Sequence, residues 1–114
     1  MGFSYQGIGE WCATFGCNGA AEGAVAKMFR NGVVKACSAG DAFCGVVRAV
    51  GRDGMACTVQ LGGMAKVPFT GEAPQVGYAK LAANGNGGVS VNAAGASYLV
   101  VRVDEENQML TIKL

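Results

Sequence analysis

The stretch SYLVVRVDEENQMLTIKL, residues 97–114, decides the fold class. Apolar and polar residues alternate before Asp104 and again after Gln108, with the period of two that is typical of half-buried strands. The residues expected to share one face are Leu99, Val101 and Val103 in the first run, and Leu110, Ile112 and Leu114 in the second. The polar residues between the two runs are typical of a turn. The stretch therefore predicts an antiparallel hairpin.

The same pattern recurs upstream, between turn signals rich in glycine and asparagine. Asn31-Gly32 and Asp53-Gly54 favour tight hairpin turns because both positions tolerate positive φ. Nineteen glycines in 114 residues would weaken most helices, so an all-β chain is predicted. The predicted strands are residues 24–29, 33–37, 43–50, 55–61, 64–69, 76–82, 89–92, 98–104 and 109–114.

The sequence also repeats itself at an offset of 53 to 55 residues. The matched segments are Ala26-Lys27 with Ala79-Lys80, Asn31-Gly32 with Asn84-Gly85, Val46-Val47-Arg48 with Val100-Val101-Arg102, and Thr58-Val59-Gln60-Leu61 with Thr111-Ile112-Lys113-Leu114. We therefore predict a single β domain over residues 23–114, built from two pseudo-repeated four-stranded units at 23–61 and 76–114. Two such units can cover each other's apolar faces, which gives a compact antiparallel β-barrel or sandwich.

Residues 1–22 differ from both copies and are predicted to be a glycine-rich and aromatic N-terminal leader. Aromatic residues in such a leader either pack back on their own barrel or anchor on another subunit, because buried aromatic residues dominate interface energies. Both outcomes stay open at this point. The candidate partner-contact residues are Phe3, Tyr5, Trp11 and Phe15.

Charge and hydropathy argue against two classes of partner. Nine Lys and Arg against eight Asp and Glu give a formal net charge of +1, and the cations are scattered singly along the chain. A nucleic-acid-binding protein normally concentrates basic residues in a patch, so no nucleic-acid partner is predicted. No stretch approaches the length of apolar sequence that a membrane helix requires, and the N-terminus lacks a secretory signal. We expect cytosolic synthesis and no membrane partner.

The sequence contains few of the residues and motifs that catalysis commonly uses. The chain has no histidine, which removes the Ser–His and Cys–His nucleophile pairs and most catalytic zinc sites. Its five cysteines lack the paired short spacing of a structural zinc site and are read as small buried apolar residues. The glycine runs lack the Lys-Ser/Thr of a phosphate-binding loop. We therefore predict no catalytic residues, no metal and no cofactor, and hence no enzyme.

Four segments together resemble the small decoration, or head cement, proteins of tailed bacteriophages and prophages. These segments are Gly23-Ala24-Val25-Ala26-Lys27, Asn31-Gly32-Val33-Val34, Asp41-Ala42-Phe43-Cys44-Gly45-Val46-Val47 and Val59–Val67. The resemblance extends over residues 22–114, and the final strands also fit the way such chains end.

The resemblance implies a non-enzymatic protein that binds and stabilises an assembled phage capsid through the major capsid protein. It implies a place on the capsid surface of the virion, self-association as a homo-oligomer such as a trimer, and an N-terminal arm that contacts the capsid. Two alternatives remain: another small β-barrel binding or structural module, such as a phage tail component, and a small enzyme that would need a pocket with perturbed carboxylates or a cysteine thiolate.

Overall fold

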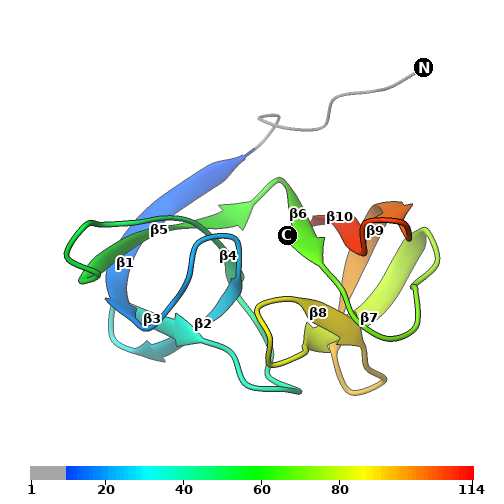
Figure 1. The fold of residues 1–114 in the computed structure, drawn as a ribbon, viewed down its shortest axis with the longest axis horizontal. Coiled ribbons are helices and arrows are strands. Elements are labelled where there is room, and N and C mark those ends of the chain that lie inside the picture. The colour runs from blue at the N-terminus through cyan, green and yellow to red at the C-terminus, as the bar shows by residue number, and fades with distance from the viewer. Residues whose placement is uncertain (1–9) are drawn as a thin grey trace.

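The computed structural model of the protein describes residues 10–114, and every regular element in that range is a strand (Figure 1). The strands of the N-terminal half are β1 (Trp11–Asn18), β2 (Val25–Arg30), β3 (Val33–Ala36), β4 (Gly45–Val50) and β5 (Ala56–Gly62). Those of the C-terminal half are β6 (Met64–Pro68), β7 (Gly77–Ala83), β8 (Val89–Val91), β9 (Ala96–Asp104) and β10 (Met109–Lys113). The prediction of an all-β chain is confirmed.

The first unit, β1–β5, is a closed barrel with the strand order β1-β3-β2-β4-β5. Strand β1 closes it, because β1 pairs antiparallel with β5 on one side and parallel with β3 on the other. The other neighbouring strands are antiparallel. A barrel has no free sheet edge, and closure therefore protects this unit from edge-to-edge pairing.

The second unit, β6–β10, repeats this topology with the order β6-β10-β9-β7-β8. Its sheet lacks a full closing strand pair, but Phe69 forms a parallel bridge to Val89 where the first unit pairs β1 with β3. Each strand of the first unit thus has a counterpart five strands later. Figure 1 shows the two units side by side along the longest axis of the molecule.

Strand register supports the internal repeat in detail. Val47 pairs with Val59, and Val100 pairs with Ile112, at the same 53-residue offset (100 − 47 and 112 − 59). In the first unit a β-bulge follows Val47, and in the second unit a β-bulge follows Val100. Arg48 and Val101 are therefore the extra residues. A bulge conserved between two halves of one chain is a positional feature of the fold, as bulges generally are.

Because of the bulge at Val101, one predicted strand face was wrong. Leu99, Val101 and Val103 were expected to lie together, but the extra residue at Val101 reverses the alternation. Val100 is fully buried, and Val103 packs against the same cluster. The prediction for β10 is confirmed, because Leu110 and Ile112 are buried together and Leu114 packs on their cluster.

The unit boundaries also differ from the prediction. Residues 1–22 were expected to form a leader with no place in the repeat, yet Trp11–Asn18 is strand β1 of the first barrel. Its counterpart is β6, which was predicted as a strand at residues 64–69 but lay outside both predicted units. Each unit consequently holds five strands rather than four.

The hairpin alignment shifts as well. Met28 pairs with Val34, and Ala83 with Val89, at an offset of 55 (83 − 28 and 89 − 34). The turn Asn31-Gly32 therefore corresponds to Asn86-Gly87, not to Asn84-Gly85. Gly32 and Gly87 both have positive φ, of 70° and 89°, which few other residues adopt without strain.

Two apolar clusters hold the units. One fills the first barrel and includes the buried Val34, Val47 and Val59. The other fills the second unit but also takes in residues from the outside of the first barrel: Val25, Phe43 and Val46. The core of the second unit is thus completed by the first unit, and we conclude that the two form one packed domain.

Backbone hydrogen bonds and one aromatic pair bind the units at this junction. Gly40 donates to the Ala83 carbonyl (2.8 Å), and Ala83 donates back to the Asp41 carbonyl (2.9 Å). The Phe43 and Tyr98 rings stack, with centroids 4.7 Å apart and planes at 9°. The Tyr98 hydroxyl also donates to the Phe43 carbonyl (3.1 Å).

Candidate partner-binding surface

Strand β1 begins at an exposed tryptophan. Trp11 is the only tryptophan of the chain, and 57% of it is exposed. It pairs with Gly62 at the end of β5. A Cβ added at Gly62 would lie 2.1 Å from Trp11 Nε1, so the glycine leaves the space that the indole occupies. The ring is therefore seated on the barrel while much of its surface faces solvent.

A buried glutamine supports this end of β1. Gln60 is fully buried; its Oε1 accepts from Arg48 Nη1 (2.6 Å), and its Nε2 donates to the carbonyls of Gly62 (3.0 Å) and Met64 (2.8 Å). Arg48 also forms an ion pair with Glu10 (3.1 Å). Because a buried amide with all these partners is costly to displace, the β5–β6 connection and the start of β1 are held in one geometry.

The structure separates the predicted contact residues. Phe15 is half-buried and packs on the core of the first barrel. Of the two outcomes that the sequence left open, this residue therefore packs back on its own barrel. Trp11 remains exposed and is free to meet a partner. Phe3 and Tyr5 lie outside the described residues.

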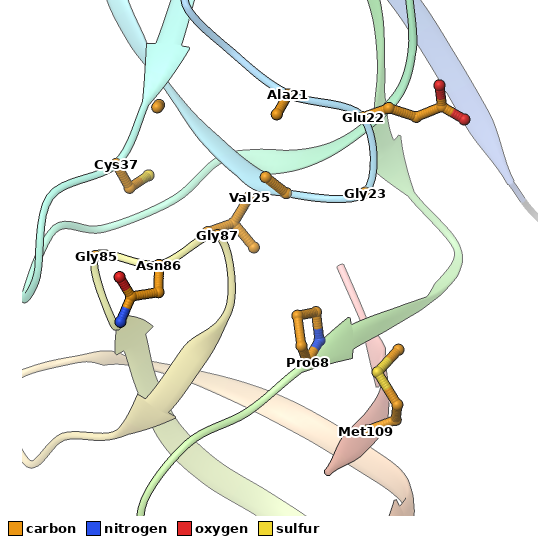
Figure 2. A pocket seen from close by; sticks show the side chains of 12 residues that line it. Ala21, Glu22, Gly23, Val25, Cys37, Pro68, Gly85, Asn86, Gly87 and Met109 are labelled. Atoms are coloured by element: carbon orange, nitrogen blue, oxygen red, sulfur yellow. The ribbon is translucent and has the colours of Figure 1, made fainter. Parts of the chain in front are cut away.

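A groove lies along the seam between the two units (Figure 2). Its volume is about 550 Å³, and its walls come mainly from the segment before β2, the β7–β8 loop, Pro68 and Met109. Small and apolar residues dominate the walls; the polar side chains are Glu22, Asn86 and Cys37. Figure 2 shows Glu22 extending away from Asn86. The groove thus lacks the convergent polar groups that are usual in a small-molecule site.

Three cysteine thiols, those of Cys37, Cys44 and Cys57, have raised pKa values that favour the protonated state. Burial raises the pKa of Cys37 to about 11, with the nearby Asp41 carboxylate as a smaller cause. Burial likewise raises the pKa of Cys57 to about 11 and also raises that of Cys44. A nucleophilic cysteine needs the opposite shift, toward the thiolate.

Two carboxylates have lowered pKa values because their partners favour the ionised form. The pKa of Asp41 is lowered first by its hydrogen bond from Lys27 and then by the Ser38 amide. The pKa of Asp104 is lowered by the side chain and backbone of Asn107. Asp41 lies in the β3–β4 loop and Asp104 is the last residue of β9, and both carboxylates accept hydrogen bonds. Within residues 10–114 no three His, Cys, Asp or Glu side chains gather as potential metal ligands.

Sequence reasoning missed the exposed apolar residues of the β-sheet surface. Tyr78 and Val76 on the second unit are 78% and 67% exposed, and Met28 and Phe29 on the first are 46% and 45% exposed. The sequence offers no signal that separates Tyr78 from its counterpart Val25, because both are apolar strand residues, yet Tyr78 is exposed and Val25 is buried. Val25 is buried because the second unit packs on it. How the two units dock is not encoded in a local sequence pattern.

No protein-family model matches this chain, and no curated protein matches it. In residues 10–114 no helix has the length and hydropathy of a membrane span.

Proposed function

We propose that this protein is a non-enzymatic structural protein that binds and stabilises an assembled phage-type capsid, with the major capsid protein as its partner. It would act on the capsid surface of the virion after synthesis in the bacterial cytoplasm. The resemblance of residues 22–114 to head decoration proteins supports this class of partner, and the exposed Trp11 at the start of β1 supports a contact there.

Trp11 is the observation that carries the proposal. A large aromatic side chain that is 57% exposed on a barrel strand offers apolar area that a partner can bury. Tryptophan is also among the residues most enriched at the centres of interfaces. The Gln60 network holds the strand beneath the ring, so little conformational freedom is lost when a partner binds.

A capsid suits a small contact of this kind. Many copies of the protein bind many copies of the same capsid subunit, so the affinity of each contact can be modest while the shell as a whole is reinforced. If neighbouring copies are also linked to one another, their binding gains effective concentration.

Co-sedimentation with purified capsids tests the proposal. We expect the protein to pellet with expanded heads of its own phage and to saturate at a fixed ratio to the major capsid protein. Absence of binding to both expanded and unexpanded heads would contradict it and would favour another module, such as a tail component. Loss of binding on Trp11→Ala would identify the surface.

A further inference from the structure

A second, smaller cleft lies on the outer face of the second unit. Its volume is about 290 Å³, and it is lined by Lys66, Arg102, Asp104, Asn107, Met109 and Thr111. Three of these residues form a row, because Thr111 of β10 pairs with Lys66 of β6 on one side and with Arg102 of β9 on the other. Residues paired in this way project from the same face of a sheet. The fold therefore places one cation on each side of a threonine.

Thr111 lies between the two cations and is shielded from solvent. Its neighbours Leu110 and Ile112 belong to the core of the second unit, so by alternation Thr111 points to the outer face of the sheet. It is nevertheless only 7% exposed, whereas Lys66 and Arg102 are exposed. Side chains on the outer face must therefore cover it, and a group bound beside its hydroxyl is partly withdrawn from water.

The positive charge of the row is not neutralised by an ion pair. None of the ion pairs within residues 10–114 includes Lys66 or Arg102. The carboxylate in the cleft is Asp104, and Asn107 engages both of its oxygens: the backbone amide donates to Oδ1 (3.2 Å) and the side-chain amide to Oδ2 (2.9 Å). The two glutamates that follow Asp104 are exposed and do not line the cleft. The row thus offers two cations to a ligand.

The corresponding row of the first unit carries no charge. There Thr58 of β5 pairs with Thr14 of β1 and with Ala49 of β4. Thr58 corresponds to Thr111, and Ala49 to Arg102, at the 53-residue offset (111 − 58 and 102 − 49). Strand pairing at this position is therefore compatible with a neutral row. The fold does not require the two cations, which belong to the second unit alone.

From this difference between the units we propose that the cleft binds the phosphate group of a small phosphate monoester. Three strands contribute one hydrogen-bond donor each: the Lys66 ammonium, the Thr111 hydroxyl and the Arg102 guanidinium. A monoester phosphate has three terminal oxygens to accept from these three groups, whereas a carboxylate has two. Charge-assisted hydrogen bonds, above all those of the planar guanidinium, are among the strongest in proteins.

The other walls of the cleft indicate which kind of molecule carries the phosphate. Met109 supplies an apolar surface for a short carbon chain. The Asn107 side-chain amide nitrogen is engaged by Asp104, which leaves its Oδ1 to accept from a hydroxyl of the ligand. A volume of about 290 Å³ is at the lower end for small-ligand sites, so a short phosphate ester suits the cleft.

A nucleic acid fits the cleft less well. An internal phosphodiester has only two terminal oxygens, and a nucleic-acid surface normally needs a larger basic patch than two cations. The inference is also independent of the capsid, because it rests on the second unit and on a ligand that the capsid does not supply.

An NMR titration of the purified full chain with glycerol 3-phosphate, without capsids, tests the proposal. We expect saturable shifts of the amide signals of Lys66, Thr111 and Arg102, with a dissociation constant below about 5 mM. The titration is made at constant ionic strength and about pH 7.5, where the phosphate is mostly dianionic. Acetate should bind at least about 5-fold more weakly.

Four variants assign the site. Arg102→Gln and Lys66→Gln each remove one cation and should raise the dissociation constant at least about 5-fold. Thr111→Val keeps the shape of the side chain, loses the hydroxyl and should raise the constant at least about 2-fold. Lys80→Gln is the matched control, because it removes the same charge from an exposed lysine of β7 outside the cleft. It should bind like the wild type, and circular dichroism checks that each variant is folded.

Four results would overturn the proposal. The first is the absence of a saturable shift at about 20 mM glycerol 3-phosphate. The second is a Lys80→Gln variant as impaired as Arg102→Gln, which indicates attraction to the net charge only. The third is acetate binding as tight as that of the phosphate ester, and the fourth is tighter binding of a single-stranded oligonucleotide through the same residues. No capsid is present in this titration, so its outcome and that of the co-sedimentation are independent.

Discussion

Trp11 and Phe15 lie on one strand, four residues apart, and have different surroundings. Phe15 pairs opposite the buried Cys57 and packs on the barrel core, whereas Trp11 pairs opposite Gly62 and remains 57% exposed. The glycine makes the difference, because any larger residue would displace the indole. Gly62 on β5 thus determines how the Trp11 ring is seated on the barrel.

Replacement of Trp11 should separate binding from stability. Trp11→Ala should weaken capsid binding at least about 10-fold, since interface tryptophans often contribute about 2 kcal/mol or more. Its unfolding free energy should fall by less than that of a core substitution, because much of the ring is exposed. Binding isotherms and chemical denaturation measure the two effects. Met55→Ala, at a residue 71% exposed elsewhere on the barrel, should change neither; equal loss of binding in both variants would contradict the proposed surface.

The ionisation of Asp41 should make the stability of the protein depend on pH in the acid range. Its pKa in the folded protein is below the ordinary value of 3.8, chiefly because Lys27 hydrogen-bonds to the ionised carboxylate. A depressed folded pKa contributes stability that is present above the unfolded pKa and is lost as the pH falls through the folded value. We therefore expect the denaturant concentration at the unfolding midpoint to fall when the pH is lowered below about 4, and to fall less in Asp41→Asn.

Asp104 has the same direction of shift, from Asn107, so Asp41→Asn should leave part of the acid dependence in place. Identical pH profiles for the wild type and Asp41→Asn would show that the Lys27–Asp41 pair has no linkage to folding.

At the scale of elements, Gly45 is a close contact between neighbouring strands. A Cβ at Gly45 would lie 2.2 Å from the Gln60 carbonyl oxygen and 2.8 Å from Val59 Cγ1, so β4 and β5 would have to move apart. Gly45→Ala should therefore lower the unfolding free energy by at least about 2 kcal/mol, measured by guanidinium denaturation.

Ser97→Ala is the control for Gly45→Ala. Ser97 is exposed on β9, and its replacement should change the unfolding free energy by less than about 0.5 kcal/mol. A Gly45→Ala variant as stable as Ser97→Ala would contradict the packing of these strands.

Most elements were predictable from local pattern. The nine strands β2–β10 coincide with predicted runs, because each is an apolar stretch bounded by glycine, asparagine or aspartate turns. Strand β1 was missed because WCATFGCN has no clear alternation: its residues are exposed or half-buried along its whole length. Its role comes from pairing with β3 and β5, both distant in sequence.

The boundaries of the repeat were missed for the same reason. Without β1, the predicted first copy contained four strands, and β6 had no counterpart and was left outside both predicted units. The candidate site could be predicted only as a set of aromatic residues. Which of them is exposed follows from the Trp11–Gly62 pairing, a long-range contact that a local pattern does not encode.

At the scale of the whole molecule, the two units share one of the two apolar clusters. Val25, Phe43 and Val46 of the first unit belong to the cluster that fills the second, and Tyr98 stacks on Phe43 across the junction. Neither unit can unfold without exposing apolar surface of the other. We therefore infer that the domain is cooperative, in spite of its repeated architecture.

Cooperativity can be measured with two probes. Trp11 fluorescence reports on the first unit, because it is the only tryptophan, and circular dichroism reports on both. Their denaturation curves should coincide in the wild type. Tyr98→Phe removes the hydrogen bond to the Phe43 carbonyl and should cost about 1 kcal/mol, whereas Tyr98→Ala also removes the stacking and should cost about 3 kcal/mol or more. Separate transitions in the wild type would contradict a shared core.

The measurement that tests the proposed function most directly is electron cryomicroscopy of expanded heads with and without the added protein. The account predicts additional density at symmetry-related positions on the outside of the shell, with the first barrel nearest the capsid and the start of β1 at the contact. Heads that show no additional density, or density in which β1 faces away from the shell, would contradict it.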